Sequence, residues 1–284
     1  MRTRLISAAV LVPVVVIVLW AGRPWLSLAV AFLALLTAWE TAQLVRAAGL
    51  PANRWLVAVP ALLLIAHFEL TNSALTFYYG WPSQVAELVA VAWVAIAGVD
   101  GLRHQDPRQG FIAWAGTLLA GAYVSLLAFV VAVVTFHVGD ASGQGLRWLL
   151  LLVLTVWSLD SAAYAVGKYF PRGRFMNHIS PRKTWSGAIG GTVAAIAVCS
   201  ALVVVLRFEA SPVVGVILGV VIAVSAQAGD LVESMLKRAA GAKDSGTLIP
   251  GHGGFLDRVD SFLFAAPAIY VTLLVLVSAG LAVE

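Results

Sequence analysis

Charged residues are scarce in this sequence: lysine, arginine, aspartate and glutamate together make up only 11% of its 284 residues. Soluble domains carry about 25% charged residues to cover their surface, so a water-soluble globule is excluded. Hydrophobic residues reach 61%, and the mean hydropathy is +0.94. The composition is that of an integral membrane protein.

Cysteine is also nearly absent. Cys199 is the only one, and it lies in an apolar run. It has no partner for a disulfide within the chain and matches no metal-binding spacing. We expect an inert, buried thiol there.

Apolar runs recur along the whole chain with no soluble block between them, which predicts one membrane domain over residues 1–284. We expect an all-α, polytopic helix bundle, because a span needs about 20 residues. The first run follows two arginines, as in a secretory signal, but no small-x-small cleavage site follows, so we expect it to remain attached. The nine expected transmembrane helices are 6–22, 26–46, 55–69, 84–99, 112–135, 148–167, 186–206, 212–237 and 260–281.

The basic residues predict the orientation. A cytoplasmic N-terminus places 15 of the 18 lysines and arginines inside and leaves only Arg23, Arg147 and Arg207 outside, in agreement with the positive-inside rule. The net charge of +4 is thus accounted for by the loops, and we expect no nucleic-acid partner. Nine cytoplasmic cations follow spans six and eight, so we expect N-terminal helices over 1–147 and catalytic helices and loops over 148–284.

Carboxylates within spans are costly and usually mark functional paths. Glu40 and Glu87 stand alone on apolar helices, where pairing with a neighbouring helix or reaching the interface is at least as reasonable as catalysis. Asp160 heads a polar stripe that continues to Lys168. The clearest stripe lies on span eight, at spacings of three and four that share one helix face: Gln227, Asp230, Glu233, Ser234 and Lys237. Helix–helix hydrogen bonding needs only one acid, so two acids near the interface favour a cation site.

The loop after span eight, from Ser234 to Asp260, reads SMLKRAAGAKDSGTLIPGHGGFLDRVD. Its glycines and cations are typical of a polyphosphate cradle, although a loop contacting anionic lipid heads has a similar composition. Asp257 and Asp260 lie at the expected start of span nine. Asp230 and Asp257 can hold Mg²⁺ if spans eight and nine form a hairpin. His252 is equally consistent with a base, a phosphate donor or a solvated side chain.

The same loop resembles the signature of bacterial phosphatidate cytidylyltransferases, which make CDP-diacylglycerol. The matching positions are Ser234, Lys237, Arg238, Lys243, Asp244, Pro250, His252, Gly253, Gly254, Asp257, Arg258 and Asp260. A second matching stretch holds Asp160, Ala163, Tyr164, Gly167, Lys168, Ile179, Ser180, Pro181, Lys183, Thr184, Trp185 and Gly187. Two positions depart from the family pattern: Ser186 stands where we expect glutamate, and Pro171 where we expect glycine.

The resemblance implies transfer of a cytidylyl group from CTP to phosphatidate, with release of pyrophosphate. It implies Mg²⁺, a second cation by two-metal logic, contact with membrane lipid, a homodimer, and a bacterial inner-membrane location with the active site facing the cytoplasm. The implied metal ligands are Asp230 and Asp257. The implied catalytic residues are Lys237, Arg238, Lys243, Asp244, His252, Arg258 and Asp260, and the implied substrate-binding residues are Asp160, Lys168, Ser180, Lys183 and Ser234.

Three rival functions remain at this stage. A CTP-dependent lipid kinase shares the membrane setting and the nucleotide. A secondary transporter shares the many helices and intramembrane carboxylates, but its charges belong near the midplane rather than at the cytoplasmic ends. A non-catalytic scaffold is the third.

Overall fold

The structure is a computed structural model that describes residues 13–71, 84–136, 144–249, 251 and 253–281. Within these ranges the chain is built of helices and contains no strand, apart from isolated bridges that join Arg174 to Thr184 and Ile249 to Gly253. The all-α class expected from the sequence is confirmed.

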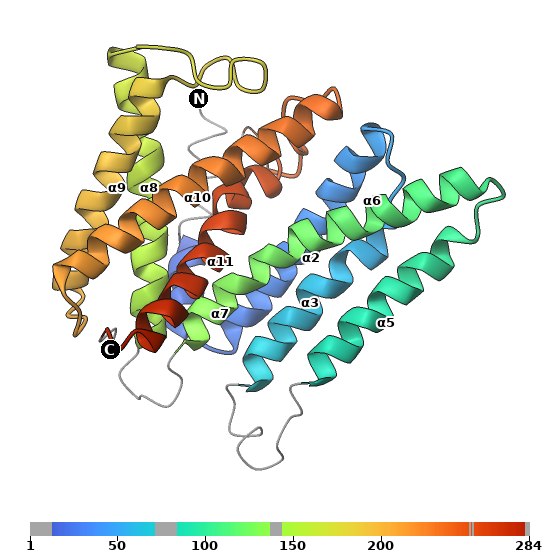
Figure 1. The fold of residues 1–284 in the computed structure, drawn as a ribbon, viewed down its shortest axis with the longest axis horizontal. Coiled ribbons are helices and arrows are strands. Elements are labelled where there is room, and N and C mark those ends of the chain that lie inside the picture. Colours follow the sequence, from blue (N-terminus) through green and yellow to red (C-terminus); the bar gives the residue numbers. More distant parts are fainter. Residues whose placement is uncertain (1–12, 72–83, 137–143, 250, 252, 282–284) are drawn as a thin grey trace. The chain divides into compact units, whose positions relative to one another are not determined.

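Figure 1 shows the order of the helices along the chain. Residues 13–21 are helical. The later helices are α2 (Trp25–Ala47), α3 (Arg54–Thr71), α5 (Gln84–Gly101), α6 (Pro107–Ser125), η1 (Leu126–Ala128), α7 (Phe129–Thr135), α8 (Gln144–Tyr169), α9 (Trp185–Val205), α10 (Pro212–Ala239) and α11 (Leu256–Ser278). The longer described connections lie between α8 and α9 and between α10 and α11.

Seven of the described helical segments are long and apolar enough to cross a membrane: α2, α3, the continuous run of α6, η1 and α7, and then α8, α9, α10 and α11. The polytopic membrane class is therefore confirmed. The first expected span, 6–22, begins outside the described residues, and α5 coincides with the fourth expected span. The total of nine and the cytoplasmic N-terminus stay predictions.

Side-chain caps fix two of the helix starts. Asp106 precedes α6 and accepts a hydrogen bond from the Arg108 N–H, with Pro107 as the first helical residue. Thr184 caps α9 in the same way by accepting from the Gly187 N–H at 3.1 Å. Both residues belong to types that favour helix N-termini because they satisfy otherwise unpaired amides.

The chain divides into two compact units. Unit 1 comprises Met1–Thr135 and Leu236–Val259, and unit 2 comprises Phe136–Met235 and Asp260–Glu284. The boundary therefore passes through α10 and through the first turn of α11. The expected division at residue 147 stays a prediction.

Glycines allow the helices of unit 2 to approach closely. A Cβ atom at Gly187 or Gly191 of α9 would lie within 2.9 Å of backbone oxygens of α8. A Cβ at Gly215 or Gly219 of α10 would lie within 2.7 Å of α-carbons of α9. Both pairs have the small-xxx-small spacing that favours helix packing in membranes. Helices α8 and α10, which carry the polar stripes, are thus each held in close contact with α9.

In unit 1, polar side chains join helices at both ends of α3. Near its C-terminus, Glu69 forms a 3.0 Å ion pair with Arg23 and accepts a 2.6 Å hydrogen bond from the Ser27 hydroxyl. Just before its N-terminus, Asn53 donates to Asp100 at the end of α5, at 2.8 Å. These contacts join α3 to the start of α2 near one end and to the end of α5 near the other.

Candidate active site

Three carboxylates of unit 2 form an acidic group: Asp230 and Glu233 on α10, and Asp260 on α11. One oxygen of each lies within 4.8 Å of the others. Glu233 is fully buried, and the other two are half-buried. A few convergent carboxylates are the ligand type that Mg²⁺ uses when phosphate oxygens complete its shell, so these residues fit a divalent cation.

Gly229 explains why α11 can approach α10 at this point. A Cβ atom there would lie 2.5 Å from the backbone oxygen of Asp260. Any side chain at this position would push the two helices apart. Because Gly229 has no side chain, Asp260 can lie beside Asp230, the residue that follows Gly229 on α10.

Three of the predicted substrate-binding residues lie near Asp230, the predicted metal ligand. Lys183 Nζ lies 2.8 Å from Asp230 Oδ2, and the Ser234 hydroxyl donates to Asp230 Oδ1 at 3.3 Å. Asp160 on α8 is near enough to both Lys183 and Asp230 for their charges to act on it. The structure therefore brings four of the predicted residues together within unit 2.

Two further predicted residues have different surroundings. Lys168 is exposed, and its Nζ lies 5.6 Å and 5.5 Å from the ring centroids of Tyr164 and Tyr169, in cation–π geometry. Ser180 lies in the turn before Lys183, where its backbone oxygen accepts from the Lys183 N–H at 3.2 Å. Ser180 thus shapes the segment that carries Lys183.

Asp257, at the start of α11, organises the signature loop in unit 1. Its Oδ1 accepts from Lys237 Nζ at 2.7 Å. Its Oδ2 accepts at 2.9 Å from the Ser245 N–H, the Ser245 hydroxyl and the Gly254 N–H. One carboxylate thus ties the end of α10, the loop and the start of α11 together.

Glu40 of α2 performs a similar task from the far end of the sequence. It is 2% exposed, and the Ser245 hydroxyl, 3.0 Å from its Oε2, shares its single hydrogen between Glu40 and Asp257. Glu40 also accepts hydrogen bonds from the N–H groups of Phe255 and Leu256, at 3.1 and 2.8 Å. These two amides begin α11, where a helix has unpaired donors and favours negative charge. The only sequence signal for this role was a carboxylate inside an apolar span, because more than 200 residues separate the partners.

A polar cavity of about 570 Å³ opens in the signature loop. Its walls include Lys243, Asp244 and Arg258, together with Gly246, Gly251 and Gly253. Two cations and glycine backbone form a surface suited to phosphate oxygens. Arg238 donates to the Ala242 oxygen at 3.1 Å, which braces the start of the loop. His252, another predicted catalytic residue, lies outside the described residues.

The fold and these sites define a polytopic membrane protein that can accommodate a divalent cation and phosphate groups. The chain belongs to the cytidylyltransferase family, whose model matches residues 2–276. It is 31% identical to the phosphatidate cytidylyltransferase of Synechocystis sp. over 301 aligned positions, which cover 94% of both chains. It is also 31% identical to the Haemophilus influenzae phosphatidate cytidylyltransferase, over 94% of this chain and 96% of that one. Identity to the Staphylococcus aureus phosphatidate cytidylyltransferase is 35%, over 67% of this chain and 70% of that one.

Family membership confirms the resemblance found in the sequence and, with it, the expected class of enzyme, a nucleotidyltransferase. The individual site residues stay predictions, and the structure adds Glu233 and Glu40 to them.

Proposed function

We propose that this chain is a phosphatidate cytidylyltransferase, which converts CTP and phosphatidate into CDP-diacylglycerol and pyrophosphate. One observation carries the proposal most strongly. The acidic group of Asp230, Glu233 and Asp260 occurs in a chain that matches phosphatidate cytidylyltransferases over 94% of its length.

In the proposed reaction, a phosphate oxygen of phosphatidate attacks the α-phosphorus of CTP. The bond from the α-phosphorus to the bridging oxygen breaks, and pyrophosphate leaves with the bonding electrons. Since the nucleophile is already an anion, little proton transfer is required. The residues of the chain must mainly position two mutually repelling phosphates and screen their charge.

The acidic group is the proposed Mg²⁺ site, with Asp230, Glu233 and Asp260 as ligands. Bound Mg²⁺ would supply positive charge to the phosphate oxygens of the transition state. Lys183 holds Asp230 in place by its ion pair. Asp257 stays a predicted ligand, but its oxygens already accept four hydrogen bonds, which ligation would have to displace. A second cation is also part of the proposal.

The cavity in the signature loop is the proposed site for the CTP phosphates. Lys243 and Arg258 line it and supply positive charge. Lys237 is positioned by its 2.7 Å contact with Asp257, and Arg238 by its bond to the loop backbone. His252 remains a proposed contact to substrate.

Phosphatidate presents its phosphate at headgroup depth, whereas CTP arrives from the cytosol. The orientation predicted by the basic residues places the start of α11 and the end of α10 at the cytoplasmic face, where both substrates can be reached. We therefore place the protein in the bacterial inner membrane with its active site toward the cytoplasm. A homodimer is included in the proposal by resemblance to the family alone.

Purified protein incubated with α-labelled CTP, phosphatidate and Mg²⁺ tests this function. We expect the label to enter the lipid fraction only when all three are present. Asp230→Asn should remove this activity, whereas Glu87→Gln, which changes an exposed carboxylate on α5, should retain it. Recovery of the label only as CDP would contradict the proposal.

A further inference from the structure

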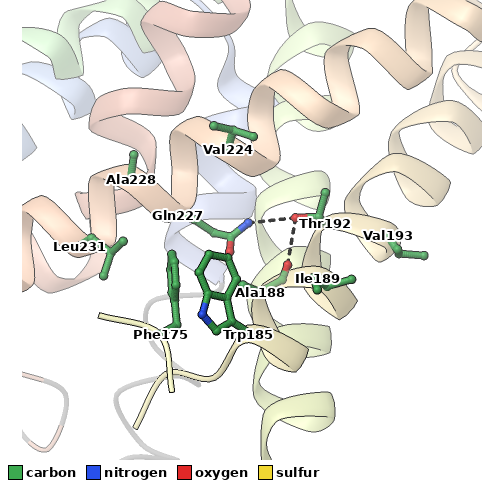
Figure 2. A pocket seen from close by; sticks show the side chains of 10 residues that line it. All are labelled: Phe175, Trp185, Ala188, Ile189, Thr192, Val193, Val224, Gln227, Ala228 and Leu231. Carbon is green, nitrogen blue, oxygen red and sulfur yellow. Dashed lines mark hydrogen bonds between the residues drawn. The ribbon is translucent and has the colours of Figure 1, made fainter. Parts of the chain in front are cut away.

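An apolar groove of about 410 Å³ lies between α9 and α10 (Figure 2). Its apolar walls include Trp185, Ile189 and Val193 of α9 and Val224, Ala228 and Leu231 of α10. The volume falls in the range of about 300–1,000 Å³ that is typical of small-molecule sites. Both helices are long and apolar enough to span a membrane, so the groove is open to hydrocarbon rather than only to water.

The groove contains two polar side chains, and their donors are already engaged. Gln227 Nε2 donates to Thr192 Oγ1 at 3.0 Å and to the Ala223 oxygen at 3.1 Å. Thr192 in turn donates to the Ala188 oxygen at 2.9 Å. Figure 2 shows the bond from Gln227 to Thr192, which joins α10 to α9, and the bond from Thr192 to Ala188 within α9. A hydrocarbon chain can therefore enter without depriving these donors of hydrogen-bond partners.

One end of the groove is aromatic and firmly held. The rings of Phe175 and Trp185 lie 4.4 Å apart between centroids. The Phe175 N–H donates to the Lys183 oxygen at 3.0 Å, and the Trp185 N–H donates to the Gly173 oxygen at 3.1 Å. These bonds fold the segment before α9 back on itself, so the aromatic end has a defined shape.

The same folded segment places a cation at this end. Lys183 lies two residues before Trp185 in the chain, and its partner Asp230 directly precedes Leu231. Trp185 and Leu231 both line the groove. The apolar groove therefore begins beside Lys183 and the acidic group, within one unit of the protein.

We infer that this groove binds an acyl chain of phosphatidate, with the lipid phosphate directed toward Lys183. An anionic lipid joins a hydrocarbon chain to a phosphate, and the groove joins an apolar surface to a cation. A neutral lipid would bring no anion beside Lys183, and a soluble anion would leave the groove unfilled. The inference rests on the proposed function for the identity of the lipid.

Ala188→Trp is the direct test, because it fills the groove from α9. The matched control is Ala95→Trp, which adds the same bulk at an exposed position of α5. Loss of contact with two methylene groups weakens binding on the order of tenfold. We expect Ala188→Trp to raise KM for dioleoyl phosphatidate by that factor, with KM for CTP unchanged. Dibutanoyl phosphatidate, whose chains barely enter the groove, should show less than a twofold change.

An equal rise in KM for both lipids, or the same effect from Ala95→Trp, would overturn the inference. A second measurement uses the unaltered protein, so it does not depend on the variant folding. Phosphatidate with a diazirine in mid-chain should label the segments 185–193 and 224–231 on irradiation. Labelling confined to other segments would refute acyl-chain binding here. If the unaltered protein makes no labelled lipid from CTP, the proposed function fails, whereas the photolabelling still reports on the groove separately.

Discussion

Glu40 Oε2 accepts a 2.8 Å hydrogen bond from the backbone N–H of Leu256, which lies 216 residues further along the chain. The same carboxylate accepts from the Ser245 hydroxyl and the Phe255 N–H. A Cβ atom at Gly246 would lie 2.5 Å from Glu40 Oε1, so a larger residue there would displace the carboxylate. The signature loop is therefore folded around a side chain that belongs to a different part of the sequence.

Removing the Glu40 carboxylate should weaken the fold and the activity together. Glu40→Ala leaves the Phe255 and Leu256 N–H groups without their acceptor in a buried site, whereas the Ser245 hydroxyl can still donate to Asp257. We expect the free energy of unfolding to fall by about 3 kcal/mol. Denaturation in detergent measures this loss. Glu40→Gln retains one acceptor oxygen, so its free energy of unfolding should lie between those of the unaltered protein and Glu40→Ala. The control is Glu87→Ala at an exposed position, and equal stabilities of the two alanine variants would disprove the role of Glu40.

Neutralising the acidic group should impair the response to Mg²⁺. Asp260→Asn or Glu233→Gln removes one of three convergent charges, so we expect kcat to fall by at least about 100-fold and half-maximal activity to require more Mg²⁺. Titration of activity with Mg²⁺, after treatment with EDTA, measures both effects. An unchanged Mg²⁺ dependence in these variants would exclude this group as the metal site.

The sequence predicted much of the fold, because the spans are strongly apolar. The expected span 55–69 corresponds to α3 at Arg54–Thr71, and the expected span 212–237 corresponds to α10 at Pro212–Ala239. Boundaries differed more where polar residues extend a helix. Helix α11 begins at Leu256 rather than 260, because Glu40 accepts from the Leu256 N–H and the Ser245 hydroxyl oxygen accepts from the Asp257 N–H.

The candidate site was predictable where its members share a helix face. Asp230 and Glu233 were recognised as neighbours from their spacing of three residues, and Asp260 from the signature loop. The contact of Asp230 with Lys183 was not visible, because it depends on how α10 meets the segment before α9. For Glu40 the sequence revealed only a carboxylate inside an apolar span. Its hydrogen-bond donors could not be predicted, since they are brought to it by tertiary packing rather than by helix periodicity.

Gly229→Ala should separate the effect of helix approach from that of charge. A methyl group there would lie 2.5 Å from the backbone oxygen of Asp260, so α11 must shift away from α10. We expect half-maximal activity to require more Mg²⁺ and the thermal stability to be lower. Gly98→Ala is the matched control, since its Cβ would meet Trp114 only at an ordinary 3.5 Å and alanine has the higher helix propensity. A Gly229→Ala protein as active and stable as Gly98→Ala would show that the close approach is unnecessary.

Removing a cation from the loop cavity should affect the nucleotide selectively. Lys243→Ala and Arg258→Ala each delete a proposed charged contact to the CTP phosphates, which corresponds to about a tenfold rise in KM for CTP. KM for phosphatidate should remain nearly constant. Arg103→Ala, an exposed arginine whose side chain is 81% accessible, serves as the control. A rise confined to KM for phosphatidate would assign the cavity to the lipid instead.

The most direct test of cytidylyl transfer compares CTP labelled at the α-phosphate with CTP labelled at the γ-phosphate, in parallel reactions with phosphatidate and Mg²⁺. Transfer of the cytidylyl group predicts that the α label enters the lipid while the γ label is released as pyrophosphate. The reverse distribution, with the γ label in lipid and the α label in CDP, would show a lipid kinase and contradict the proposed function.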